Sequence, residues 1–199
     1  MADSEDASLA RTVEALNRRN VETVVVDDGV QALSKLKDLV PEGSVIFNNT
    51  SETLDSIGYS SYVHDNPNYR NLHDEMVAET DPVKQRDIRR KATLADYFIG
   101  SVQAIAETGE VVVASGSGSQ IAAYVYGADR LIWLAGTQKI CPSLSHAIDR
   151  VRGYTLDRHD TWLQNLGRNP SPIGKLMVFE NEVVAGRITM VLINESLGW

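Results

Sequence analysis

Helical and strand-like segments alternate along this chain, and the alternation restricts the fold more than any other feature. Short β-branched runs, such as 23–26 and 111–113, are separated by stretches whose apolar residues recur every three or four positions. The first pattern is typical of buried strands and the second of amphipathic helices. The sequence therefore predicts an α/β fold with a mostly parallel sheet and helices on both faces.

The same patterns predict the individual elements of the sheet. We expect helices over 9–20, 30–40, 121–126 and 145–152. We expect strands over 23–26, 44–47, 97–99, 111–113, 131–134, 176–179 and 188–193. The last two strands could pair as a hairpin or lie as neighbours. The segment 157–174, which contains Pro170 and Pro172, is predicted as a loop.

Residues 59–91 interrupt this alternation with a polar and charged stretch. The part around 64–69 offers few candidates for a core, and the mixed charges of 81–91 suit a solvated helix better than a binding patch. We therefore predict a polar loop or lid over 59–91, within a single α/β domain of residues 1–199.

Charge and cysteine content argue against several classes of function. The chain has 19 Lys and Arg against 27 Asp and Glu, a net charge of −8, and such a negative field repels nucleic-acid backbones. Cys141 is the only cysteine, and we expect it to be a small buried residue. Disulfides and multi-thiolate metal sites are therefore excluded, and the four histidines show no metal-like spacing. We expect no metal and no cofactor.

The sequence also suggests where the protein resides. Its apolar runs are strand-sized, well below the roughly 20 residues of a membrane span. Its first residues are acidic and lack the pattern of a signal peptide. We therefore expect a cytoplasmic protein with no membrane and no nucleic-acid partner.

Ligands in open α/β sheets bind beyond the carboxyl ends of strands, which makes the segment after strand 44–47 a candidate site. Thr50 or Ser51 can cap the following helix, and Gly58 suits a left-handed helix exit. With Thr53, their hydroxyls and the free N–H groups of the helix start could bind an anion. Simple capping explains the same residues equally well.

Two more junctions and one lysine complete the candidate site. Glu107 lies among small apolar residues, where partial desolvation could tune it as a base or nucleophile, with Thr108 and Gly109 beside it. A water-facing turn glutamate is the alternative. The glycine-rich turn after strand 111–113 offers close backbone approach to an anion, and its candidates are Gly116, Gly118, Ser119 and Gln120. Lys139, after strand 131–134, could neutralise an anion or could be a solvated lysine.

Several segments in their order and spacing resemble the lactate-utilization (LUD) domain family in its short, stand-alone form. The resemblance runs from about residue 11 to the end of the chain. It is carried by Glu42-Gly43-Ser44 and residues 51–58, by residues 95–109, by Gly136-Thr137-Gln138-Lys139-Ile140, by residues 147–150 and by residues 192–198.

The resemblance implies a sheet of the general type found in ribose-phosphate isomerases, glucosamine-phosphate deaminases and CoA transferases. In such proteins, loops like 50–54, 107–109 and 116–120 gather around a small anionic substrate. Glu107 and Gly109 also resemble the Glu-x-Gly segment of CoA transferases, whose carboxylate attacks an acyl thioester. Many short relatives carry a cysteine cluster at about 165–180, which this chain lacks.

The residues and the resemblance together lead to one main hypothesis and two alternatives. The main hypothesis is a protein of lactate or organic-acid metabolism that binds a small carboxylate, phosphate or CoA-type anion at the carboxyl edge of the sheet. The alternatives are a non-catalytic accessory subunit of an iron–sulfur oxidoreductase and an acyl-transferase or isomerase that uses Glu107. Trp162 and Trp199 could form a subunit contact in a homo-oligomer or pack within the chain. The ligand-binding hypothesis requires the three turns to meet at one rim of the sheet.

Overall fold

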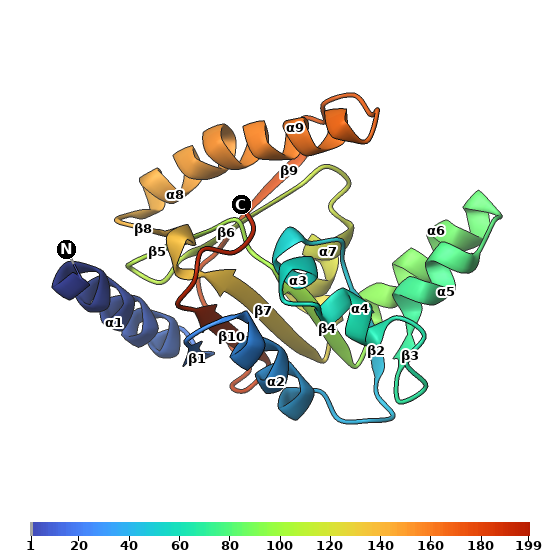
Figure 1. The fold of residues 1–199 in the computed structure, drawn as a ribbon, viewed down its shortest axis with the longest axis horizontal. Coiled ribbons are helices and arrows are strands. Elements are labelled where there is room, and N and C mark those ends of the chain that lie inside the picture. Colours follow the sequence, from blue (N-terminus) through green and yellow to red (C-terminus); the bar gives the residue numbers. More distant parts are fainter. Residues whose placement is uncertain (1) are drawn as a thin grey trace.

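A six-stranded parallel sheet forms the centre of the protein (Figure 1). The computed structural model describes residues 2–199, with side chains from residue 6 onward. The strands lie in the order β1 (Val21–Val26), β10 (Ile188–Ile193), β7 (Arg130–Gly136), β4 (Tyr97–Ser101), β2 (Val45–Asn48) and β3 (Arg70–Asn71). Every neighbouring pair in this sheet is parallel. The prediction of a mostly parallel α/β sheet is therefore confirmed.

A smaller mixed sheet packs on one face of the first. Its strands lie in the order β8 (Ile140–Cys141), β5 (Ala104–Ala106), β6 (Val111–Ser115) and β9 (Lys175–Phe179). Strand β6 is antiparallel to both β5 and β9. Because β9 and β10 belong to different sheets, the prediction that they pair or lie as neighbours is wrong. The almost wholly buried β10 fits the middle of the parallel sheet, whereas the half-exposed β9 suits an edge.

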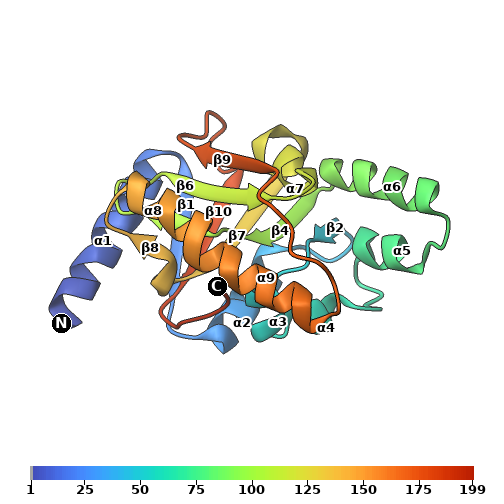
Figure 2. The same ribbon diagram turned by 90° about the horizontal axis from the view of Figure 1, so that it is seen from above.

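Helices and short turns connect and cover the strands (Figures 1 and 2). The α-helices are α1 (Ala2–Arg18), α2 (Gly29–Leu39), α3 (Glu52–Ser56), α4 (Tyr59–Val63), α5 (Leu72–Ala78), α6 (Pro82–Lys91), α7 (Ser119–Ala122), α8 (Leu144–Arg150) and α9 (Leu156–Asn165). Short 3-10 helices span Ala92–Leu94 and Thr137–Lys139, and π-helical segments span Ala123–Gly127 and Val151–Thr155. Within residues 2–199, no helix is long and apolar enough to cross a bilayer.

Three apolar clusters define the layers. The first fills one face of the large sheet, where Phe98 and Trp133 pack under α1, α5 and the inner face of the small sheet. The second fills the opposite face, where Ile99 and Leu134 pack under α2, α3 and α4. The third lies between the outer face of the small sheet and α8. Helices therefore cover both faces of the large sheet, and the small sheet shares one of them.

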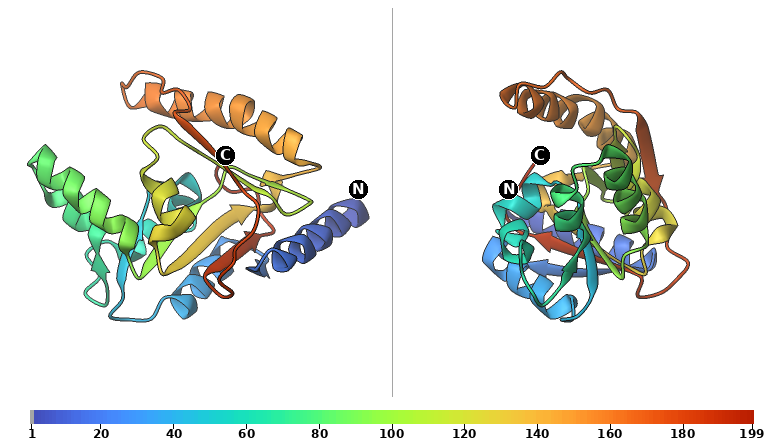
Figure 3. Two further views of the ribbon diagram at one scale, coloured as in Figure 1. Left: turned by 180° about the vertical axis from the view of Figure 1, so that it is seen from behind. Right: turned by 90° about the vertical axis from the view of Figure 1, so that its right-hand side faces the viewer.

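Residues 59–91 are mostly helical, so the prediction of a loop there is wrong. Helices α5 and α6 pack against each other and project from the body of the protein (Figures 1 and 3). Asp81 caps α6 by accepting hydrogen bonds from the N–H groups of Val83 and Lys84, and no side chain of α6 is buried. The prediction of a solvated helix over 81–91 is confirmed. A movement of this segment as a lid stays a prediction.

The predicted loop over 157–174 is also helical in its first half. Helix α8, the π-helical segment after it and α9 form one continuous helical run beside the small sheet (Figure 2). Leu163 is the one buried residue of α9, and polar residues make up most of this helix, so few core residues mark it in the sequence. The two prolines lie beyond the end of α9.

Candidate functional site

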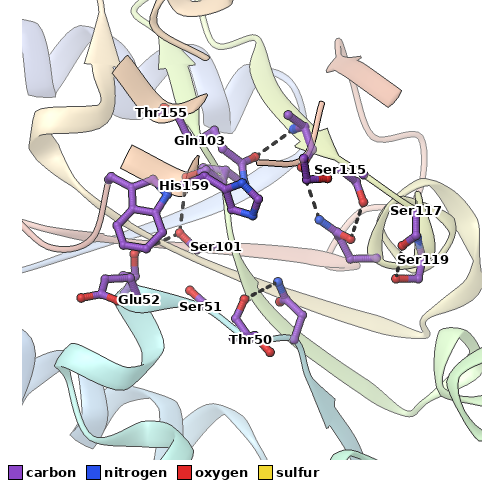
Figure 4. Close-up of a pocket in the computed structure, with 18 of the residues that line it drawn as sticks. Thr50, Ser51, Glu52, Ser101, Gln103, Ser115, Ser117, Ser119, Thr155 and His159 are labelled. Atoms are coloured by element: carbon purple, nitrogen blue, oxygen red, sulfur yellow. Dashed lines mark hydrogen bonds between the residues drawn. The ribbon is translucent and has the colours of Figure 1, made fainter. Parts of the chain in front are cut away.

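A cavity of about 360 Å³ opens where three strands end (Figure 4). It lies beyond the carboxyl ends of β2, β4 and β6, and helix α3 and the α8–α9 run supply further walls. Nine hydroxyl residues contribute to its polar lining, namely Thr50, Ser51, Thr53, Ser101, Ser115, Ser117, Ser119, Thr155 and Ser171. The carboxylates of Glu52 and Asp55 and the cations of Arg89 and Lys139 also line it. A cavity of this size and polarity is typical of a site for a small ligand.

Lys139 lies on the floor of this cavity and is only 2% exposed. Its Nζ donates hydrogen bonds to Thr53 Oγ1 and to Ser101 Oγ, each over 3.0 Å. The two hydroxyl oxygens are themselves 3.2 Å apart. The turn after β7, the start of α3 and the end of β4 thus bring one amine and two hydroxyls together. The prediction that Lys139 could be a solvated lysine is wrong.

The electrostatic setting of Lys139 is unusual for a buried lysine. Among the residues with described side chains, no carboxylate forms an ion pair with it. Burial lowers the pKa of Lys139 from 10.5 to about 7, with a further contribution from the positive charge of Arg150. Arg150 is held nearby, because its Nη1 donates to Gln103 O over 2.7 Å and to Thr155 Oγ1 over 2.9 Å. The Lys139 amine therefore exchanges between its charged and neutral forms near neutral pH.

Two of the three predicted turns meet at the cavity. Seven of the candidate residues line it, namely Thr50, Ser51, Thr53, Gly116, Ser119, Gln120 and Lys139. Ser51 also caps α3, since its Oγ accepts a hydrogen bond from Leu54 N over 3.4 Å. Gly118 is outside the lining but shapes the turn: its φ is +86° and its N–H donates to Ser115 Oγ over 2.9 Å.

The third turn, with Glu107, Thr108 and Gly109, lies away from the cavity and packs on α1. The Glu107 carboxylate accepts hydrogen bonds from Ser8 Oγ over 2.6 Å and from Arg11 Nε and Nη2 over 2.9 and 2.7 Å. The bond from Ser8, followed by those from Arg11, lowers the pKa of Glu107. The prediction that all three turns meet at one rim of the sheet is therefore wrong, because the turn with Glu107 lies elsewhere.

The small sheet explains the error. Strands β5 and β6 are antiparallel, so the turn between them lies at the amino end of β6. The glycine-rich turn follows the carboxyl end of β6, at the opposite end of that strand. Gly109 also has no room for a ligand, since a Cβ there would lie 2.8 Å from Arg19 Cδ. Glu107 therefore anchors α1, and its predicted catalytic role has no support in the geometry.

The sequence interpretation missed several residues of the cavity. Ser101 is the last residue of β4, and the rule that ligands bind beyond strand ends could have identified it. His159 and Trp162 come from α9, where the sequence predicts a loop. The ring of Trp162 lies 5.9 Å from that of His159 and 6.3 Å from that of Trp199, so the three rings form an aromatic wall.

Trp199 reaches the cavity because the segment before it is fixed beside Thr53. Gln138 Nε2 donates to Leu197 O over 2.8 Å and to Gly198 O over 3.2 Å. Gly198 has a φ of +65°, and a Cβ at this position would collide with Thr53 Oγ1. The backbone of Gly198 thus packs directly against one of the two hydroxyls bonded to Lys139.

We expect Gly198→Ala to lower the stability of the protein and to disturb the cavity. The left-handed backbone alone costs about 1–2 kcal/mol for a residue with a Cβ. Gly43→Ala is the matched control, because Gly43 has a φ of +86° but a Cβ added there would meet nothing within 4 Å. Urea denaturation should show the larger loss for Gly198→Ala, whose added Cβ also collides with Thr53, and only Gly198→Ala should weaken ligand binding. Equal binding by both would contradict the packing of Gly198 on Thr53.

One cluster of potential metal ligands lies outside the cavity. His64, Asp65 and Asp74 place one ligand atom each within 4.8 Å of one another. His64 and Asp65 are exposed, and the hydrogen bond that His64 makes to the Asp74 carboxylate raises the pKa of His64. Surface ion pairing accounts for this arrangement.

The fold and the cavity define an α/β protein with a hydroxyl-lined site at the carboxyl edge of a parallel sheet. The sequence profile of the LUD domain matches residues 9–193, and the chain belongs to this family. Membership supports a function related to lactate utilization in general terms. The resemblance noted in the sequence is thereby confirmed.

Comparison with solved structures supports the same fold. A DUF162 family protein from Deinococcus radiodurans has a TM-score of 0.59 at 10% identity, over 95% of this chain and 97% of that one. The eIF2B β subunit from Chaetomium thermophilum has a TM-score of 0.35 at 16% identity, over 58% of this chain and 43% of that one, which is too low to bear on fold or function. No curated protein sequence matches the chain. The relation to isomerases, deaminases and CoA transferases stays a prediction.

Proposed function

We propose that this protein serves lactate or related organic-acid metabolism by binding a small carboxylate in the cavity. One observation carries the proposal: Lys139 lies on the cavity floor with two hydroxyls as its hydrogen-bond partners and, among the described side chains, no carboxylate to neutralise it. A buried ammonium without a counter-ion is costly, and a bound anion would supply the missing charge. A ligand carboxylate bound at Ser101 would lie close enough to Lys139 Nζ for a favourable electrostatic interaction.

The rest of the cavity suits such a ligand and leaves room for a larger one. Arg89 adds a second cation to the lining, and the described side chains form no ion pair with it. The aromatic wall of His159, Trp162 and Trp199 offers an apolar surface on the α9 side. A phosphate ester or a CoA-type compound could use this surface, while its anionic end lies toward Lys139.

Tryptophan fluorescence provides a direct test, because Trp162 and Trp199 line the cavity while Trp133 is fully buried in the core. Titration at pH 6.5 with lactate, pyruvate, inorganic phosphate and acetyl-CoA should give saturable quenching with at least one of them. Lys139→Met should weaken that binding by about tenfold or more, since a hydrogen bond to a charged group is worth about 1.5–3 kcal/mol. Affinity should also fall above about pH 7, where Lys139 loses its proton.

Two variants serve as controls in this titration. Lys84→Met removes an exposed lysine of α6 that is outside the cavity lining, and Glu107→Gln alters the carboxylate that anchors α1. Both should bind like the wild type. A flat response to all four compounds would overturn the proposal, as would equal binding by the wild type and Lys139→Met.

The remaining parts of the sequence hypothesis stay predictions. These are an iron–sulfur oxidoreductase subunit as partner, a homo-oligomer and a cytoplasmic location. Trp162 and Trp199 lie close to each other within one chain, which accounts for them without a subunit contact.

A further inference from the structure

We propose that Ser101 is a nucleophile activated by Lys139, and that the cavity accepts activated acyl compounds, namely esters or thioesters. The inference goes beyond ligand binding, because it assigns a covalent step to a residue of the site. It starts from the contact between Lys139 Nζ and Ser101 Oγ, whose 3.0 Å separation permits direct proton transfer.

The exposure of Ser101, Lys139 and Thr53 indicates which of these residues contacts the substrate. Ser101 is 9% exposed, against 2% for Lys139 and 1% for Thr53. All three residues line the cavity, and Ser101 is the most accessible of them. This order fits a hydroxyl nucleophile with a lysine base, and it disfavours direct attack by the amine on a carbonyl compound.

The surroundings hold the amine in place and leave it free to accept a proton. Thr53 Oγ1 provides a second fixed contact at 3.0 Å, so Nζ keeps its position relative to Ser101. The charge of Arg150 disfavours the Lys139 ammonium, and the buried thiol of Cys141 lies against the Lys139 carbonyl. The other charged and titratable groups of the cavity lining are Glu52, Asp55, His73, Arg89 and His159. Burial raises the pKa of Cys141, which keeps this thiol neutral at physiological pH. Ser101 itself ends β4, a rigid strand in the interior of the sheet, and Tyr124 OH donates to its carbonyl over 3.0 Å.

The reaction balances without any oxidant or further cofactor. Ser101 Oγ forms a bond to the acyl carbon as its proton passes to neutral Lys139. The bond from that carbon to the leaving oxygen or sulfur then breaks, and the Lys139 ammonium returns the proton to the leaving group. Water then gives a proton to Lys139 and adds to the acyl carbon of the acyl-serine. The bond from that carbon to Ser101 Oγ breaks, the Lys139 ammonium returns the proton to Oγ, and the carboxylic acid is released.

The two activities proposed for the cavity respond to pH in opposite directions. Anion binding uses the charged amine and weakens above about pH 7, whereas acyl transfer uses the neutral amine and accelerates there. The failure of one is therefore distinguishable from the failure of the other.

Acetylation by p-nitrophenyl acetate tests the assignment. The wild type should release a stoichiometric burst of p-nitrophenolate, and peptide mapping by mass spectrometry should place the acetyl group on Ser101. The burst rate should rise through about pH 7. It should fall by about 100-fold or more in Ser101→Ala and Lys139→Met, the scale of general-base catalysis. In Lys139→Met the inflection near pH 7 should also disappear.

Control variants separate the chemistry from damage to the fold. Ser61→Ala removes an exposed hydroxyl of α4 that is outside the cavity lining and should react like the wild type. Ser101→Cys keeps a nucleophile in place and should restore a burst that Ser101→Ala lacks. Mapping on the wild type does not depend on any variant folding. An acetyl group on Lys139 or Thr53, or on surface amines alone, would overturn the proposal.

Discussion

Arg187→Met should lower the free energy of unfolding by about 3–5 kcal/mol, the cost of breaking a buried ion pair. Arg187 is 8% exposed and Glu182 is 6% exposed, and Arg187 Nη1 donates to Glu182 Oε2 over 2.7 Å. The guanidinium also donates to the carbonyl groups of Ala123, Tyr124 and Ala128. Ala123 and Tyr124 belong to the π-helical segment after α7, and Ala128 caps its C-terminal end. Removal of the guanidinium leaves a buried carboxylate and three buried carbonyl groups without their donor.

Urea denaturation measures this loss, and two further variants test its cause. Arg86→Met removes an exposed arginine of α6 and should change stability by less than about 0.5 kcal/mol. Adding Glu182→Gln to Arg187→Met should recover part of the loss, because the variant then buries no unpaired charge. If Arg187→Met and Arg86→Met were equally stable, the buried pair would have no structural role.

The stability of the wild type should rise by about 2 kcal/mol relative to Lys139→Met between pH 7 and pH 9. The pKa of Lys139 is about 7 in the folded protein and 10.5 without burial. Between these two values the unfolded chain binds more protons than the folded one, so the free energy of unfolding increases with pH. Lys139→Met has no such group, and it should therefore exceed the wild type in stability by more at pH 7 than at pH 9.

Denaturation of both proteins at the two pH values gives this difference directly. Other groups that titrate in the range, such as Cys141, are present in both proteins and cancel. Lys84→Met should follow the wild type, because Lys84 is exposed. A constant difference between wild type and Lys139→Met across the range would mean that Lys139 keeps its charge in the folded state, and that it supplies no neutral base below about pH 9.

The sequence predicted five of the six described strands of the large sheet, because these strands contain short apolar runs, and it missed β3, whose residues Arg70 and Asn71 are both polar. It failed for α5 and α9, and the reason is the same in both cases. These helices bury few side chains, for example Leu72 and Met76 in α5 and Leu163 in α9, so few core residues mark them in the sequence. A helix that covers little core carries little periodic signal.

The candidate site could be predicted only in part. The strand-end rule correctly placed the segment around Thr53, the glycine-rich turn and Lys139 together. It failed for Glu107 because it assumes a single parallel sheet, and the pairing of β5 with β6 in a second sheet has no local signal. The burial of Lys139, on which both proposed activities depend, follows from contacts between residues 38 and 86 positions apart.

The order of strands has a consequence for how the chain acquires its structure. Strand β1, the earliest in the chain, has β10 as its only neighbour in the sheet of the described residues, with Val21 opposite Ile188. In a nascent polypeptide, the backbone groups of β1 therefore lack this partner until residues 188–193 have been synthesised. Pairing between strands so far apart in the sequence slows folding, and until it occurs the unpaired edge of β1 is open to aggregation. Folding assistance during synthesis would matter most for this first strand.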